Sequence, residues 1–221
     1  MKRFDCSAVV FDLDGVLVDS AAYVEQQWRR WASSRGLRPE PFLRVCHGRR
    51  ALETIRMAAP HLDAEAEVRA FVPLEEGGES LGPLPGALRL LTTLPTGAWG
   101  VATSGGRATA TGRLRRAGLP VPPVLVCAED VTRGKPSPDA YLLAARSLGC
   151  PPDQVLVVED APGGIQAART AGMSIIGLTT THTAILLDAD ACAASLVGVH
   201  LGRVNRAADG RDRLELLVVE A

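Results

Sequence analysis

Short apolar runs recur along the chain, and segments of helical period separate the later ones. The runs do not alternate apolar with polar residues, so they predict strands that are buried on both faces, as in a parallel sheet. Five runs have this character, and they cover residues 8–11, 98–102, 124–127, 155–158 and 174–178.

The helical segments between the later strands end on glycine, which suits the left-handed position that follows a helix. They cover residues 108–118, 139–149 and 164–172. Residues 203–219 predict a terminal hairpin around Asp209-Gly210. Strands that alternate with helices indicate an α/β fold, here a doubly wound, Rossmann-like parallel sheet. In such a sheet we expect ligands at the carboxyl ends of the strands.

The pattern changes between the first strand and the second, where no good strand is present. Helical period marks residues 22–35, with two tryptophans spaced for packing, and residues 51–59. We therefore expect a small all-helical cap domain inserted after the first strand, bounded by Gly77-Gly78 and by the Gly- and Pro-rich residues 82–86. The predicted division is a Rossmann-like catalytic core of residues 1–18 and 84–221 and a cap of residues 19–83.

Composition and charge limit the kinds of molecule that we expect this protein to bind. The 221 residues carry a net charge of −1, which gives no sign of a nucleic-acid or anionic-membrane partner. No apolar run reaches the ~18 residues of a membrane span, and no signal-peptide core follows the first residues. We therefore expect a soluble, cytoplasmic protein, with a monomer favoured. Five cysteines without C-x-x-C spacing indicate free thiols in a reducing compartment.

The strongest chemical pattern is Asp12-Leu13-Asp14-Gly15, which leaves the first predicted strand. Residues two apart in an extended chain point the same way, so both carboxylates can reach the crevice. Two close carboxylates raise each other's pKa unless a cation intervenes. The pair therefore suits a divalent metal, or a division of labour between a nucleophile and a general acid/base. The alternative interpretation is a helix cap or a turn.

Two further loops follow later strands. Thr103-Ser104 enters a helix, and its hydroxyls, N–H groups and positive helix end predict a phosphate seat, although such residues also form ordinary helix caps. Lys135 follows the third strand and is one of only two lysines beside 22 arginines. A compact ammonium is not interchangeable with guanidinium beside crowded carboxylates and a phosphate, so we interpret Lys135 as functional.

Glu159-Asp160 ends the fourth strand. An isolated acidic pair in this position is often a helix cap. Beside Asp12 and Asp14, however, the pair supplies the further oxygen ligands that Mg²⁺ requires for near-octahedral coordination. Four strand ends thus present a nucleophile, a hydroxyl, a cation and metal ligands in order.

With these four motifs in order, the sequence resembles the haloacid dehalogenase-like (HAD) hydrolase superfamily, in the branch with a helical cap after the first strand. Residues 101–105, 158–165 and 46–50 are most similar to its sugar-phosphatase group. That group includes bacterial hexitol and sugar phosphatases and fungal glycerol-3-phosphate and 2-deoxyglucose-6-phosphate phosphatases. The resemblance implies a Mg²⁺-dependent phosphomonoesterase that hydrolyses a small sugar or polyol phosphate through an aspartyl-phosphate.

The resemblance also implies a role for each motif residue. Asp12 would attack phosphorus, and Asp14 would act as the general acid and then the general base. The phosphate oxygens would be held by Thr103 and Lys135 and by the main-chain N–H groups of Leu13 and Ser104. The Mg²⁺ ligands would be Asp12, Asp160, the main-chain carbonyl of Asp14, and Glu159 either directly or through water.

In the cap, His47-Gly48-Arg49-Arg50 is the best candidate for selecting the leaving group, because the core motifs deal only with phosphate and metal. We expect His47, Arg49 and Arg50 to offer donors to sugar hydroxyls without an apolar pocket. A β-phosphoglucomutase, which shares the whole core and transfers phosphate between sugar positions, stays open as an alternative. A non-catalytic binding module on the same fold is the less favoured alternative.

Overall fold

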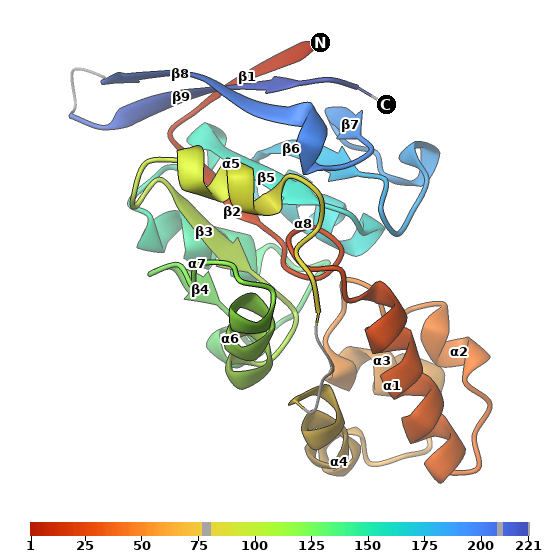
Figure 1. Ribbon diagram of the computed structural model, residues 1–221. Helices are drawn as coiled ribbons and strands as arrows, with labels where there is room; N and C mark the ends of the chain where they lie inside the picture. Colours follow the sequence, from red (N-terminus) through yellow and green to blue (C-terminus); the bar gives the residue numbers. More distant parts are fainter. Residues whose placement is uncertain (77–80, 207–209, 221) are drawn as a thin grey trace.

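The computed structural model describes residues 1–76, 81–206 and 210–220 (Figure 1). At its centre lies a six-stranded parallel sheet with the order β4-β3-β2-β5-β6-β7, which is the Rossmann order. The strands are β2 (Ala8–Phe11), β3 (Trp99–Ala102), β4 (Leu125–Val126), β5 (Val155–Glu159), β6 (Ser174–Leu178) and β7 (Ala191–Ala193). The five predicted strands are confirmed, whereas β7 is too short and too polar in its surroundings to be recognised from sequence.

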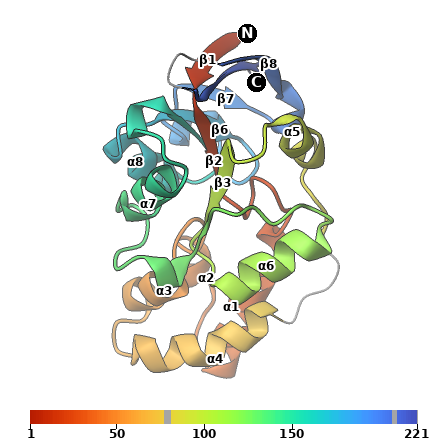
Figure 2. The same cartoon turned by 90° about the vertical axis from the view of Figure 1, so that its left-hand side faces the viewer.

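Helices cover both faces of this sheet (Figure 2). Those on one face are α5 (Ala87–Thr93) and α6 (Arg107–Arg116), and those on the other are α7 (Asp139–Ser147) and α8 (Pro162–Thr170). Alternate residues of β2 serve the two layers: Phe11 packs in the cluster with Leu90, and Val10 packs in the cluster with Tyr141. This burial on both faces explains why the strands are continuous apolar runs.

A second, three-stranded antiparallel sheet lies at the end of the molecule remote from the inserted helices (Figure 1). It joins β1 (Lys2–Cys6) to β9 (Asp212–Val218) and β9 to β8 (Val199–Arg206). The predicted hairpin is confirmed, although β8 begins at Val199 rather than at residue 203. The Asp209 part of its turn lies outside the described residues. Strand β1 was not predicted, because its partner is at the other end of the chain.

The insertion after β2 is helical in its described part and comprises α1 (Ala21–Ser34), α2 (Glu40–Leu43), α3 (Ala51–Ala58) and α4 (Ala64–Glu76). These helices form a group beside the carboxyl edge of the sheet and share a hydrophobic cluster of their own (Figures 1 and 2). Trp28 stacks on Phe42 and Phe71 with ring centroids 5.6 and 4.2 Å apart, so the tryptophan is packing, as expected. The predicted boundary at Gly77-Gly78 lies outside the described residues.

All five cysteines are free thiols, as expected. Burial raises the pKa of Cys6, Cys46 and Cys127 to about 12, which keeps these thiols protonated and unreactive. Among the described residues, no helix combines the length and the apolar character that crossing a bilayer requires.

Candidate active site

The loop after β2 carries the first two predicted carboxylates. Asp12 is buried and directly follows β2. Its main-chain N–H donates to the carbonyl of Val158 at 2.9 Å, which fixes the Asp12 backbone against β5. Gly15 follows with a φ of 80°, and a Cβ at this position would lie 2.1 Å from Oδ2 of Asp160. Only glycine therefore lets the turn pass this close to Asp160.

The carboxylate of Asp14 has different neighbours. Ser20 Oγ donates to Asp14 Oδ1 at 2.5 Å, and Arg113 Nη1 donates to Asp14 Oδ2 at 2.6 Å. Arg113 lies on α6 and is only 1% exposed. Sequence reasoning missed it, because nothing in its own segment separates it from the neighbouring arginines of a basic helix end.

Lys135 reaches the same site from the loop after β4. Its Nζ donates to Asp12 Oδ1 at 2.5 Å and to Glu159 Oε1 at 2.7 Å, and it lies 4.8 Å from the centre of the Tyr141 ring. Burial alone would lower the pKa of Lys135, but the carboxylates of Asp12 and Glu159 raise it well above its usual value. The ammonium is therefore charged throughout the physiological range and lies directly beside Asp12.

Both carboxylate oxygens of Glu159 are already engaged. Oε1 accepts from Lys135 and from Tyr141 Oη at 3.0 Å, while Oε2 accepts from the main-chain N–H groups of Asp160 and Ala161 at 2.7 and 2.8 Å. In this arrangement Glu159 anchors the lysine and the turn after β5. Tyr141, which sequence reasoning also missed, completes the anchor from α7.

Asp12, Glu159 and Asp160 each place a carboxylate oxygen within 4.8 Å of the others, so the group could hold a metal ion. Burial raises the pKa of Asp12 to about 7, against the opposing charge of Lys135, and burial with Glu159 raises that of Asp160 well above its usual value. Crowded, desolvated carboxylates favour a hard divalent cation, because its charge stabilises their ionised forms. The donor set therefore fits such an ion. Thr181 Oγ1 donates to Asp160 Oδ2 at 2.6 Å and orients this carboxylate.

The Thr103-Ser104 loop, which was predicted to bind phosphate, lies at the end of β3. Thr103 is buried after β3, and its Oγ1 accepts from the N–H of Gly105 at 3.1 Å. The first N–H of helix α6, that of Arg107, donates to the carboxylate of Glu129 at 3.0 Å. This part of the helix end is therefore occupied by a side chain, so the predicted phosphate contacts are reduced to the Thr103 hydroxyl and the strand-end main chain.

A cavity of about 320 Å³ lies over these groups and is walled by core and cap together. Asp12, Asp14, Thr103 and Asp160 face it from the core, and His47, Arg49 and Arg50 face it from the cap. The expectation of a cap wall without apolar groups is wrong. Packing of α1, α3 and α4 brings apolar side chains to the wall, and these are Val24, Trp28, Leu52 and Val68.

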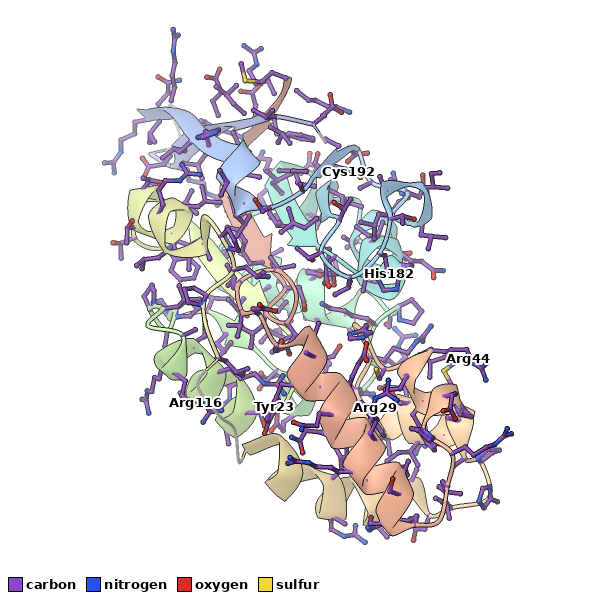
Figure 3. All side chains as sticks on the ribbon, turned by 45° about the vertical axis from the view of Figure 1, so that its right-hand side comes forward. Tyr23, Arg29, Arg44, Arg116, His182 and Cys192 are labelled. Atoms are coloured by element: carbon purple, nitrogen blue, oxygen red, sulfur yellow. The ribbon has the colours of Figure 1, made fainter. Side chains whose placement is uncertain are left out.

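Two histidine rings, one from the cap and one from the core, lie near each other. The ring of His47, in the cap, lies 6.4 Å from that of His182, which Figure 3 labels on the core side. His182 Nδ1 is 3.1 Å from the carbonyl oxygen of Asp160, so this histidine lies beside the acidic group. His47 Nε2 is 3.5 Å from Glu25 Oε1.

Gly164, in the first turn of α8, lies against the anchored Glu159. A Cβ at Gly164 would lie 1.6 Å from Glu159 Oε1, whereas a Cβ at Gly163 would meet nothing within 4 Å. We expect Gly164→Ala to displace Glu159. The free energy of unfolding should fall by about 1–3 kcal/mol, as it does in other overpacking changes. Activity should also fall, because Glu159 anchors Lys135. Gly163→Ala, measured beside it by calorimetry and turnover, should stay near the wild type. Equal behaviour of the two variants would contradict this account of Glu159.

Capped α/β hydrolases share the combination found here, a Rossmann-like sheet whose carboxyl edge carries acids, a hydroxyl and a lysine beneath inserted helices. The family model of haloacid dehalogenase-like hydrolases matches residues 6–172. The chain belongs to this family.

Two curated proteins and one solved structure show what this chain is similar to. The chain is 45% identical over 182 residues to hexitol phosphatase A of Escherichia coli K12, a match that covers 78% of this chain and 83% of the relative. It is 34% identical over 200 residues to glycerol-1-phosphate phosphohydrolase 2 of Saccharomyces cerevisiae, covering 84% and 80%. A crystal structure of a hydrolase from Pseudomonas syringae superposes with a TM-score of 0.77 at 28% identity, covering 86% and 94%.

Proposed function

We propose that this protein is a phosphatase that hydrolyses a small sugar or polyol phosphate with Asp12 as the nucleophile. The observation that carries the proposal is the buried contact of Asp12 with Lys135 at the base of a cavity closed by helices. The similarity to a hexitol phosphatase and to a glycerol-1-phosphate phosphohydrolase supports the same chemistry and the same substrate class.

The residues fit a two-step displacement. An oxygen of Asp12 attacks phosphorus and the bond to the leaving oxygen breaks, while Asp14 gives that oxygen a proton. Asp14 then takes a proton from the water that hydrolyses the aspartyl-phosphate. Lys135 and Thr103, with the N–H groups of Leu13 and Ser104, hold the phosphate oxygens, because phosphoryl transfer needs mainly positioning and charge neutralisation.

Mg²⁺ is the proposed metal, since hard carboxylate and carbonyl oxygens are its usual protein ligands. Asp12 and Asp160 would hold it with the main-chain carbonyl of Asp14, and the four donors around Glu159 favour a contact of that residue through water. Bound there, the ion would neutralise charge on the phosphate and orient it.

The cap is proposed to span residues 19–83 and the core residues 1–18 and 84–221. Leaving-group selection belongs to the cap, because the cavity wall above Asp12 comes from α1, α3, α4 and the loop before α3. A volume of about 320 Å³ is at the small end of ligand sites and suits a single sugar or hexitol unit. A monomer is the proposed active unit, and the free thiols suit the cytoplasm.

A phosphate-release screen over sugar and polyol phosphates tests the function. Mg²⁺-dependent release of inorganic phosphate, fastest with a hexitol or polyol phosphate, is the expected result. A mutase would instead return isomerised sugar phosphate with little free phosphate. A non-catalytic module would bind the compounds and release nothing.

Arg49 is the cap residue that we expect to bind the leaving group, because it lines the cavity above the core motifs. Arg49→Ala should raise KM for the best sugar phosphate about tenfold or more, the cost of a lost charge-assisted hydrogen bond, with little change in turnover of p-nitrophenyl phosphate. Arg44→Ala is the matched control, since Arg44 is exposed on the outer side of the cap (Figure 3). An equal effect of Arg49→Ala on both substrates would remove Arg49 from the substrate site.

A further inference from the structure

The guanidinium of Arg50 makes several hydrogen bonds within the protein. Arg50 is the N-cap residue of α3, and its Nε donates to both carboxylate oxygens of Glu53, at 2.7 and 2.9 Å, one turn along the helix. Its Nη2 also contacts Glu53. The side chains are only 13% and 23% exposed, so this is a shielded, multiply bonded pair rather than a surface ion pair.

The pair reaches out of the cap and onto the core. Arg50 Nη1 donates to the carbonyls of Ala128 and Val131 at 3.3 and 3.1 Å, and Nη2 donates to that of Thr132 at 3.0 Å. These three residues lie between β4 and Lys135. Every nitrogen of the guanidinium is thus directed at Glu53 or at this core loop.

Glu53 contacts the same loop two positions beyond Thr132. Its Oε1 accepts from the main-chain N–H of Gly134 at 3.3 Å. A Cβ at Gly134 would lie 2.6 Å from Nε of Arg50 and 2.8 Å from Oε1 of Glu53, so the absence of a side chain there lets the pair approach the backbone. The residue that follows is Lys135, whose Nζ must meet Asp12 and Glu159.

We propose that Arg50 and Glu53 are positioning residues, which fix the loop that carries Lys135 when the cap is seated on the core. In this role they contribute to catalysis with every phosphomonoester and do not contact the leaving group. The inference rests on the proposed function for its kinetic test. It assigns Arg50 a role other than the hydroxyl contact that its sequence neighbours suggested.

The role has a kinetic signature. A loosened loop displaces Lys135 from Asp12, and misplacement of a catalytic group by about 1 Å can cost on the order of 10²-fold in rate. The loss therefore falls on kcat and is the same for a sugar phosphate and for p-nitrophenyl phosphate, while KM for the sugar phosphate changes little. Loss of a hydroxyl contact would do the reverse.

The test compares Arg50→Ala and Glu53→Ala with Arg56→Ala in the full-length protein. Arg56 is also on α3 and also contacts a cap glutamate, Glu65, but both of these side chains are more than half exposed. We expect kcat to fall about 10- to 100-fold in Arg50→Ala and Glu53→Ala on both substrates, and to stay near wild type in Arg56→Ala. Glu53→Gln keeps an acceptor for the Gly134 N–H and should recover part of the loss.

A second measurement does not depend on activity. Hydrogen exchange of the Gly134 amide, followed in the segment 131–135, should rise about tenfold or more in Glu53→Ala and should not change in Arg56→Ala. Unchanged exchange, or a sugar-specific rise in KM with intact kcat in Arg50→Ala, would overturn the inference. If the wild type releases no phosphate from any substrate, the proposed function fails while the exchange measurement still decides whether the pair holds the loop.

Discussion

Asp12→Asn is expected to abolish phosphate release while the protein stays folded. The amide can neither attack phosphorus nor ligate a metal as a carboxylate does, and loss of a nucleophile elsewhere costs on the order of 10⁴-fold or more in kcat. Folding should persist, because Lys135 keeps its contact with Glu159 at 2.7 Å. Turnover in excess Mg²⁺, together with circular dichroism and thermal unfolding, measures both parts.

The control for this variant is Asp19→Asn, in the same loop, since Asp19 is exposed whereas Asp12 is 3% exposed. It should keep full activity. Removal of divalent metal with excess EDTA should also stop wild-type turnover, and Mg²⁺ should restore it. Substantial turnover by folded Asp12→Asn, or full activity in EDTA, would falsify the mechanism.

Lys135→Ala should lose on the order of 10²-fold or more in kcat, as removal of a preorganised electrostatic group does. It should also lower stability, because Glu159 would remain buried at 0% exposure without its cation. Lys135→Arg should not restore activity. Nζ is enclosed by Asp12, Glu159 and the ring of Tyr141, so the larger planar head overpacks the site.

Lys2→Ala is the natural comparison, since Lys2 is the other lysine of the chain and is exposed on β1. It should behave like the wild type in turnover and thermal unfolding. Because Lys135→Ala should unfold at a lower temperature than the wild type, its kcat is measured well below its own midpoint of unfolding, at a temperature where circular dichroism shows a folded chain. Near-native turnover in Lys135→Arg would show that any cation serves at this position.

Prediction from sequence succeeded where a local pattern decides the outcome. The five buried strands are continuous apolar runs, and Gly118, Gly149 and Gly172 have the positive φ values expected after helices. The four motifs were also predicted to meet, because parallel strands place their carboxyl ends at one edge of the sheet. Asp12, Lys135, Glu159 and Asp160 indeed lie together there.

Prediction failed where a contact joins segments that are far apart. Arg113 and Asp14 are separated by 99 positions, and Arg50 and Val131 by 81. Both arginines resemble their neighbours in sequence, one in a basic helix end and the other in an Arg-Arg pair. Which of two adjacent arginines binds the core loop depends on the rotation of α3 and on how the cap packs against the core.

The sequence by itself therefore determined the strand pattern, the insertion point of the helices and the groups that converge at the carboxyl edge of the sheet. These follow from local periodicity and from the geometry shared by all parallel α/β sheets. Only the tertiary structure decided how each side chain is used: that Glu159 anchors Lys135, that Arg113 holds Asp14 and that Arg50 contacts the core. The physical reason is that hydrogen bonding is directional and short-ranged, so its partners depend on side-chain positions that packing alone determines.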